Sequence, residues 1–355
     1  MKKIIVLIIV ILSLTGCYDN IELNDLSIIS GVGIDYIDDK YYVTYEILSN
    51  TKTIENTTLK SYTISGSGKN ISDAFIDANY KTGNKAYFAH LKIIILGRDI
   101  FKGHFEGITD YLLRDINIRD EFKVVMASNT TPEEILKHNT ESIPVVSEFL
   151  MKLLQTEKYN NNLVIDENFE DIVKKAISKN YDVILNTIAI KDNDIAIDNS
   201  IILKESKYQA TLSKKNSSLY NMLSTNTLAI EFEKKYDNKM FTINVNNSKT
   251  TIEVTKDKIK ISANLVAEVL ENNPKFNLKD EDTYKRLNKD FEKVIQKDII
   301  DFIKLLQDEE CDIFGFQEIY YKKYRKENKK LWLTSDIEVK VDLKINTKGL
   351  IFEVN

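Results

Sequence analysis

The chain has 355 residues, of which 43% are hydrophobic and 29% are charged, and its formal net charge at pH 7 is −5. This composition excludes bulk disorder, and the mild negative charge argues against general nucleic-acid binding, which depends on neutralising phosphates. Its 2 Cys, 3 His and 3 Pro cannot supply a disulfide framework, a cysteine-rich zinc site or a proline-rich linker.

The N-terminal segment has the layout of a secretory signal. A basic start at residues 1–3 is followed by an unbroken apolar run at residues 4–12 and by small residues before Cys17. The apolar run is too short to cross the roughly 30 Å hydrocarbon core of a bilayer as a helix. The four residues from Leu14 to Cys17 look like a bacterial lipobox, in which the Cys thiol receives a diacylglyceryl group and the chain is cut just before it. We therefore expect residues 1–16 to be a lipoprotein signal peptide and Cys17 to be the lipidation site.

Lipidation of Cys17 would determine where the chain resides. A diacylglyceryl group supplies two acyl chains, and stable anchoring generally takes two signals. We therefore expect the chain on the outer face of the cytoplasmic membrane, or on an outer membrane where the organism has one. No Ser/Gly tether follows Cys17, so the folded body should stay close to the bilayer. Cys311 would then have no disulfide partner within the chain.

Residues 17–180 alternate predicted strands with predicted helices, which indicates an α/β or α+β N-terminal domain. Strands are expected at 41–48, 58–65, 91–96 and 123–127, and helices at 71–80, 105–115, from 132 onward and at 145–156. The first helix should be capped by Asn70, with Asp73 reaching back in a capping box. Another helix should begin after Thr131, with Pro132 in its first position.

The pattern changes twice after residue 180. Between residues 181 and 255, short strand candidates separated by Asn-, Asp- and Lys-rich turns predict a β-rich middle domain. Residues 256–355 predict a C-terminal α+β domain, in which a long helix at 284–306 covers an antiparallel sheet. The fold class is therefore α+β, or mixed α/β, with three domains whose mixed or antiparallel sheets pack against helices.

Motifs that could carry catalysis are weak. The segment from Ser65 to Asn70 is similar to the end of a phosphate-binding loop, but Thr63 and Asn70 occupy the positions of the first Gly and the metal-binding hydroxyl. His90 has no carboxylate or Cys partner that the sequence can place beside it, which favours a structural role. The basic stretch at 322–330 is expected to be a solvated loop rather than a headgroup contact. We expect no enzyme activity, no cofactor and no metal site.

Several segments together carry a resemblance, and they occur in one order along nearly the whole chain. They are residues 14–26, 31–35, 72–74, 88–97, 112–115 with 118–119, and 311–316 before Trp332. In this order they resemble the C subunit of the spore nutrient-germinant receptors, also called the GerAC or Ger(x)C germination lipoproteins. Tyr18 stands where that family usually has Trp, and the middle region matches poorly.

The resemblance implies a three-domain α/β protein without catalytic activity on the outer face of the inner spore membrane. It implies assembly with two integral-membrane subunits, A and B, into a receptor for small nutrients, which the complex rather than this chain would bind. Cys17 would hold the chain at the membrane. The residues expected to contact partners follow it: Tyr18, Asp19, Glu22 and Leu23. Arg114, Asp115 and the Phe314-Gly315 turn are expected to be fold determinants.

Two other classes of function stay open at this point. A solute-binding lipoprotein would deliver a small molecule to a membrane transporter and would be stabilised by its ligand. A surface enzyme is the other class, although no motif in the sequence supports it.

Overall fold

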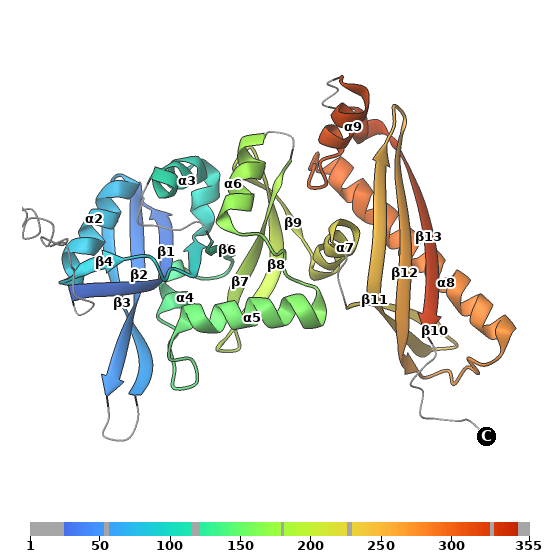
Figure 1. Cartoon of the computed structure of the whole chain (residues 1–355), viewed down its shortest axis with the longest axis horizontal. Coiled ribbons are helices and arrows are strands. Elements are labelled where there is room, and N and C mark those ends of the chain that lie inside the picture. The colour runs from blue at the N-terminus through green and yellow to red at the C-terminus, as the bar shows by residue number, and fades with distance from the viewer. Residues whose placement is uncertain are drawn as a thin grey trace, which may run out of the picture.

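The computed structural model describes residues 25–52, 57–114, 121–178, 181–225, 229–326 and 330–346. Two β-sheets lie one after the other along the long axis of the molecule (Figure 1). Helices cover both faces of the first sheet and one face of the second, whose strands alternate buried and exposed residues. Within the described ranges, no helix is long and apolar enough to cross a bilayer.

The first sheet has nine strands in the order β3-β2-β1-β5-β6-β7-β8-β9, with β4 beside the start of β1. Neighbours from β1 through β5 and β6 to β7 are parallel, and the hairpins on either side are antiparallel. The strand bounds are β1 Leu26–Ile37, β2 Lys40–Lys52, β3 Thr57–Gly68, β4 Lys85–Tyr87, β5 Ile93–Leu96, β6 Lys123–Ala127, β7 Val183–Lys191, β8 Asp194–Lys204 and β9 Lys207–Leu212.

Helices pack against both faces of this sheet. One face is covered by α2 (Ile71–Thr82), α3 (Phe105–Arg114) and α6 (Phe169–Ser178), and the other by α4 (Pro132–Leu136) and α5 (Val146–Asn161). The predicted strand at 91–96 is confirmed as β5. Ile94 and Leu96 belong to the core of the first face, whereas Ile93 and Ile95 belong to that of the second. Burial on both faces explains why this strand is continuously apolar rather than alternating.

The second sheet has the order β10-β11-β12-β13, with bounds Ile230–Tyr236, Lys239–Val254, Lys258–Asn272 and Asp336–Asn346. The predicted long helix is α8 (Glu281–Asp308), and its apolar stripe, including Phe291 and Ile295, packs into the core of this sheet. The antiparallel sheet expected within residues 256–355 is wrong, because the two strands of that range, β12 and β13, are parallel. Antiparallel pairing occurs from β10 to β12. Parallel neighbours need a crossover connection, and α8 followed by α9 (Phe316–Tyr324) lies within it.

The strands of residues 181–255 are shared between the two sheets. β7, β8 and β9 complete the nine-stranded sheet, while β10 and β11 begin the four-stranded one. The helix α7 (Lys214–Ser224) lies between these two groups and contributes Leu219 and Met222 to the core shared with the second sheet.

Of the two helix caps predicted from the sequence, the one at Thr131 is confirmed and the one at Asn70 is wrong. Thr131 caps α4, with Pro132 following it, and the side chain of Glu134 completes a capping box. Asn70 precedes α2 as expected, but its side chain makes no capping hydrogen bond. Instead, Asn70 Nδ2 donates to Asp73 Oδ2 at 3.2 Å. The two side chains that were expected to cap backbone groups satisfy each other.

Candidate functional site

The residues predicted for anchoring and partner contact precede the first strand. Cys17, Tyr18, Asp19, Glu22 and Leu23 lie outside the described residues. Residue 25 is the first that the structure describes, and the first three residues of β1 pair in parallel with β4. The chain therefore connects to its N-terminal segment beside β4, at the end of the molecule where α2 lies (Figure 1).

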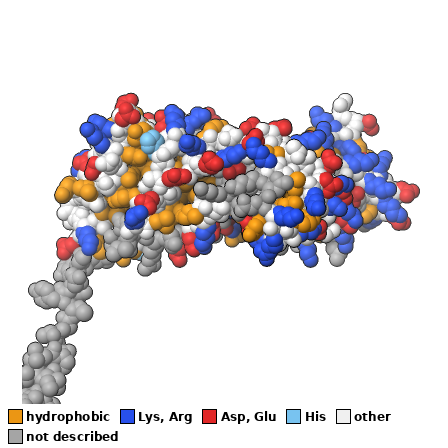
Figure 2. Space-filling view, turned by 90° about the horizontal axis from the view of Figure 1, so that it is seen from above, with side chains coloured by type: hydrophobic (Ala, Val, Ile, Leu, Met, Phe, Trp, Pro, Cys, Tyr) orange, Lys and Arg blue, Asp and Glu red, His pale blue; other side chains and the backbone are white. Residues whose placement is uncertain are grey.

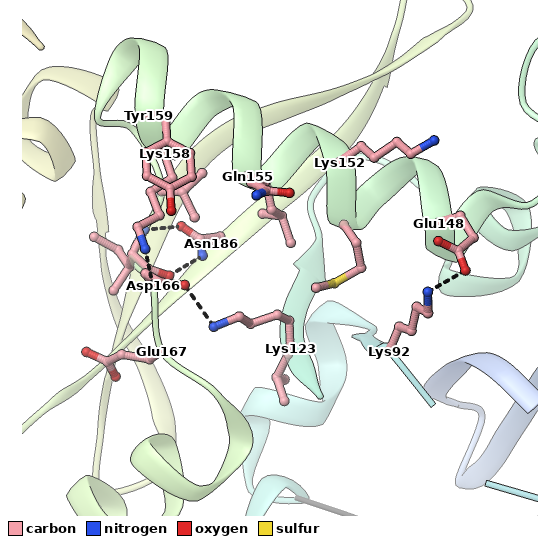
Figure 3. Close-up of a pocket in the computed structure, with 15 residues that line it drawn as sticks. Lys92, Lys123, Glu148, Lys152, Gln155, Lys158, Tyr159, Asp166, Glu167 and Asn186 are labelled. Atoms are coloured by element: carbon pink, nitrogen blue, oxygen red, sulfur yellow. Dashed lines mark hydrogen bonds and ion pairs between the residues drawn. The ribbon is translucent and has the colours of Figure 1, made fainter. Parts of the chain in front are cut away.

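A pocket of about 480 Å³ lies between α5 and the amino ends of β5 and β6 (Figure 3). Apolar side chains from β6, α5 and residues 164–165 form part of its lining. Its charged lining residues are four lysines and three acids: Lys92, Lys123, Lys152, Lys158, Glu148, Asp166 and Glu167.

Ion pairs arrange these charges in two groups. Lys92 pairs with Glu148 on one side, and on the other side Lys123 and Lys158 both point to Asp166 (Figure 3). The distance from Lys123 Nζ to Asp166 Oδ1 is 2.9 Å. Burial acts to raise the pKa of Asp166, but the hydrogen bonds from Lys158 and Lys123 outweigh it and hold this pKa below its ordinary value. One carboxylate is thus shared by two ammonium groups, which leaves positive charge in excess on this side.

Glu167 lies beside this group and is largely buried. Its Oε1 pairs with Lys175, whose Nζ also donates to the Tyr220 hydroxyl at 3.4 Å. Its Oε2 has no hydrogen-bond partner among the residues that the structure describes. Burial raises the pKa of Glu167 above its ordinary value despite the nearby Lys175 ammonium. Lys175 on α6 therefore connects Glu167, in the pocket wall, to Tyr220 on α7, the helix between the two sheets.

Asn186 fixes the backbone at the edge of the pocket. Its Oδ1 accepts the Ile165 N–H at 2.9 Å, and its Nδ2 donates to the Ile165 carbonyl at 2.8 Å. Asn186 is on β7 and only 6% exposed, so both bonds form away from water. These bonds determine where the next residue, Asp166, presents its carboxylate to the two lysines.

The chemistry available in the pocket is electrostatic. Lys123 and Lys158, which share one carboxylate and lie beside an apolar wall, can bind a small anion such as a carboxylate or a phosphate. Across the described ranges, no cluster of three or more His, Cys, Asp or Glu side chains is placed to hold a metal ion. The pocket residues come from Lys92 just before β5, from β6, α5 and β7, and from residues 164–167, and no local motif could have revealed them.

A second buried polar cluster centres on Glu46, which is 0% exposed. The Glu46 carboxylate accepts hydrogen bonds from the Ser30 hydroxyl at 3.1 Å and the Ser61 hydroxyl at 2.8 Å. It also accepts the backbone N–H groups of Val146 at 2.6 Å and Ser147 at 2.9 Å. These are the first two residues of α5, so Glu46 neutralises the positive end of that helix from within the sheet. The sequence analysis missed this residue.

The 311–316 segment forms a tight turn between α8 and α9. The Asp312 carboxylate accepts the backbone N–H groups of Phe316 at 2.7 Å and Gln317 at 3.0 Å, which are the first two residues of α9. Asp312 also exchanges hydrogen bonds with Asp182, which directly precedes β7. Gly315 has φ +69°, and a Cβ built on it would be 2.0 Å from the ring of Tyr181. The segment therefore joins the second sheet's helices to the start of β7 in the first sheet.

Arg114, His90 and the start of the basic stretch lie at the surface. The Arg114 Nε donates to Asp110 at 2.9 Å, whereas Asp115, Ile118 and Arg119 lie outside the described residues. His90 is exposed, with its ring 6.1 Å from that of Tyr87. The basic stretch was expected to be a loop, which is wrong for its first residues, because Lys322 and Lys323 belong to the last turn of α9.

Comparisons with known proteins give one consistent result. The family model "Spore germination protein N-terminal domain" matches residues 19–190, and the model "Spore germination B3/ GerAC like, C-terminal" matches residues 198–349. Spore germination protein KC of Bacillus subtilis (strain 168) is 24% identical to the chain, covering 98% of this chain and 94% of that protein. Spore germination protein GerQC of Bacillus cereus is 23% identical, with 99% of each chain covered.

A solved structure shares the fold. The chain is similar to the crystal structure of the GerBC protein, with a TM-score of 0.56, 16% sequence identity, and coverage of 89% of this chain and 96% of that one. Together, the two family models span most of the sequence in chain order. The chain therefore belongs to the GerAC-like family of spore germination proteins.

Proposed function

We propose that the chain is the lipid-anchored, non-catalytic C subunit of a spore nutrient-germinant receptor. It would reside on the outer face of the cytoplasmic membrane that becomes the inner spore membrane, and would assemble there with two integral-membrane subunits, A and B. The observation that carries this proposal is the match of both family models, in order, over residues 19–190 and 198–349.

Anchoring through Cys17 supplies the physical reason for assembly. A diacylglyceryl group on Cys17 would confine the chain to the membrane that holds its partners, so that effective concentration replaces high intrinsic affinity. Tyr18, Asp19, Glu22 and Leu23 follow Cys17 directly and would be the residues closest to the membrane-embedded subunits.

The test is Cys17→Ala in spores of the source organism, with Cys311→Ser as the matched control because Cys311 is buried and free. Membrane retention and nutrient-triggered germination should both be lost in Cys17→Ala and both be kept in Cys311→Ser. Retention without Cys17 would contradict the anchor. Lost retention with a normal nutrient response would contradict the receptor role.

A second candidate function, binding of a small solute, is favoured by the pocket in Figure 3. In that case a small carboxylate or phosphate should raise the melting temperature of the parent protein in a concentration-dependent manner. Lys158→Ala removes one of the two ammonium groups on Asp166 and should abolish this shift, whereas Lys285→Ala on the exposed face of α8 should not. A melting temperature insensitive to such anions would remove this candidate.

A further inference from the structure

Exposed apolar side chains occur at the end of the first sheet where α2 meets β4. Tyr80 is 84% exposed, more than any other large hydrophobic side chain in the described ranges, and Ile76 is 48% exposed one helical turn earlier. Tyr87 on β4 is 37% exposed. Figure 2 shows hydrophobic side chains gathered over this end of the molecule. We call Ile76, Tyr80, Lys81, Lys85 and Tyr87 the α2–β4 corner.

The α2–β4 corner lies where the chain leads to Cys17. Lys85 pairs with Leu26, the first residue of β1, and Tyr87 pairs with Ile28. Cys17 is eight residues before residue 25, and eight residues extend over at most about 28 Å. A lipid on Cys17 therefore keeps this corner near the bilayer, whereas the four-stranded sheet lies at the opposite end of the long axis (Figure 1).

The chemistry of the corner suits a membrane surface. Tyrosine rings carry an apolar body and a polar hydroxyl, and they are enriched at the level of the lipid headgroups. Residues 80–87 contain Lys81 and Lys85 and no acidic residue. Lys81 pairs with Asp77 at 2.8 Å on the solvent side of α2, while Lys85 is exposed. Lysines at the level of the lipid headgroups are attracted to anionic headgroups.

We propose that the α2–β4 corner is a membrane-contact surface that rests in the headgroup region of an anionic phospholipid bilayer. The proposal rests on lipidation of Cys17, which is part of the proposed function. Tether length, exposed tyrosines and lysines all favour a lipid surface over a protein groove. The contact orients the molecule, with the first sheet at the membrane and the four-stranded sheet projecting away from it.

Nitroxide labels can measure this contact because the chain offers a clean background. Cys311 is 0% exposed and an acylated Cys17 has no free thiol, so the lipidated parent should take up no label. Tyr80→Cys places a label in the corner. Tyr321→Cys is the matched control, since Tyr321 is 41% exposed on α9, far from α2 in Figure 1. Both lipidated full-length variants are reconstituted in phosphatidylcholine vesicles with and without phosphatidylglycerol.

The readout is the ratio of collision rates with lipid-soluble oxygen and with a water-soluble nickel chelate. In phosphatidylglycerol vesicles the ratio should be several-fold higher for the label at position 80 than for the label at position 321. Equal ratios in vesicle-bound protein would overturn the contact surface while leaving the anchor intact. A ratio at position 80 that does not fall without phosphatidylglycerol would overturn the anionic preference. Labelling of the parent would reveal a free Cys17 and overturn the anchor together with this proposal.

Discussion

The Glu46 carboxylate accepts the backbone N–H of Ser147 at 2.9 Å across 101 residues of sequence. This bond ties the centre of β2 to the first turn of α5, and α5 in turn forms one wall of the pocket. A buried carboxylate is stable only when donors surround it, and this one has four. Glu46 thus couples the packing of β2 to the position of α5.

Glu46→Gln should destabilise the protein by about 3 kcal/mol, because charge-assisted bonds are replaced and the amide NH₂ meets another donor. The free energy of unfolding, measured by chemical denaturation, is the readout. Glu141→Gln is the matched control, since Glu141 is exposed, and it should leave the transition midpoint unchanged. Equal stability of Glu46→Gln and the parent would contradict the bonding described for Glu46.

Gly315→Ala should cost about 3 kcal/mol, from a left-handed backbone and from overlap of the new Cβ with the Tyr181 ring. Gly83→Ala separates the two causes, because Gly83 has φ +74° and open space around it, and it should cost only about 1 kcal/mol. Thermal unfolding of both variants gives the comparison. Adding Tyr181→Ala to Gly315→Ala should recover part of the loss, and strictly additive effects would rule out the overlap.

Stability should depend on pH through Asp312. Burial raises the pKa of Asp312 from 3.8 to about 7, despite backbone N–H groups that favour the carboxylate. Between these values the folded chain keeps a proton that the unfolded chain has lost, so the free energy of unfolding falls as pH rises from about 4 to about 7. Across this pH range, the titration of Asp312 lowers the free energy of unfolding by about 4 kcal/mol in total. Asp182, whose pKa burial also raises, acts in the same direction.

Asp312→Asn removes this titration, so the difference in stability between parent and variant should shrink as pH rises through the same window. Denaturation at several pH values measures it. Asp342→Asn, at an exposed position of β13, is the control for replacing an aspartate by asparagine. A pH-independent difference for Asp312→Asn would show that folding does not raise the pKa of Asp312.

Asn186→Ala should cost about 3 kcal/mol, because the N–H and carbonyl of Ile165 lose their partners in a buried place. Asn186→Asp keeps an acceptor for the N–H but sets an oxygen against the Ile165 carbonyl. The midpoint of Asn186→Asp should therefore lie between those of Asn186→Ala and the parent, or no higher than that of Asn186→Ala. Denaturation midpoints of the three proteins are the measurement, and an unchanged midpoint for Asn186→Ala would contradict the role of this side chain.

Much of the first sheet could be predicted from local pattern. The strands at 41–48, 58–65, 91–96 and 123–127 correspond to β2, β3, β5 and β6, because burial on one or both faces leaves a direct trace in the residue types. The pairing partners could not be predicted in this way. The alternating pattern of β13 is the same as that of any half-buried strand and does not reveal its direction. The crossover through α8 and α9 makes β13 parallel to β12.

Elements with buried polar residues escaped the sequence analysis. In α7 the buried side includes Ser217, Ser218 and Asn221, so the apolar period that identifies a helix is broken. Asn221 Nδ2 donates to the carbonyls of Asn162 and Val164, which is a tertiary role that the sequence does not display. Glu46 escaped for the same reason. The pocket could not be predicted from the sequence, because its charged side chains come together only after β5, β6 and α5 have packed.

The order of strands has a consequence for how the protein forms. After the β1–β2–β3 meander, β5 joins at the free edge of β1, and each strand from β6 to β9 then joins next to the strand before it. The second sheet grows from β10 to β13 in the same manner. Among the strands that the structure describes, none has to insert between two that are already paired. Each sheet can thus be built progressively as the polypeptide emerges from the ribosome or a translocation pore, without undoing earlier hydrogen bonds.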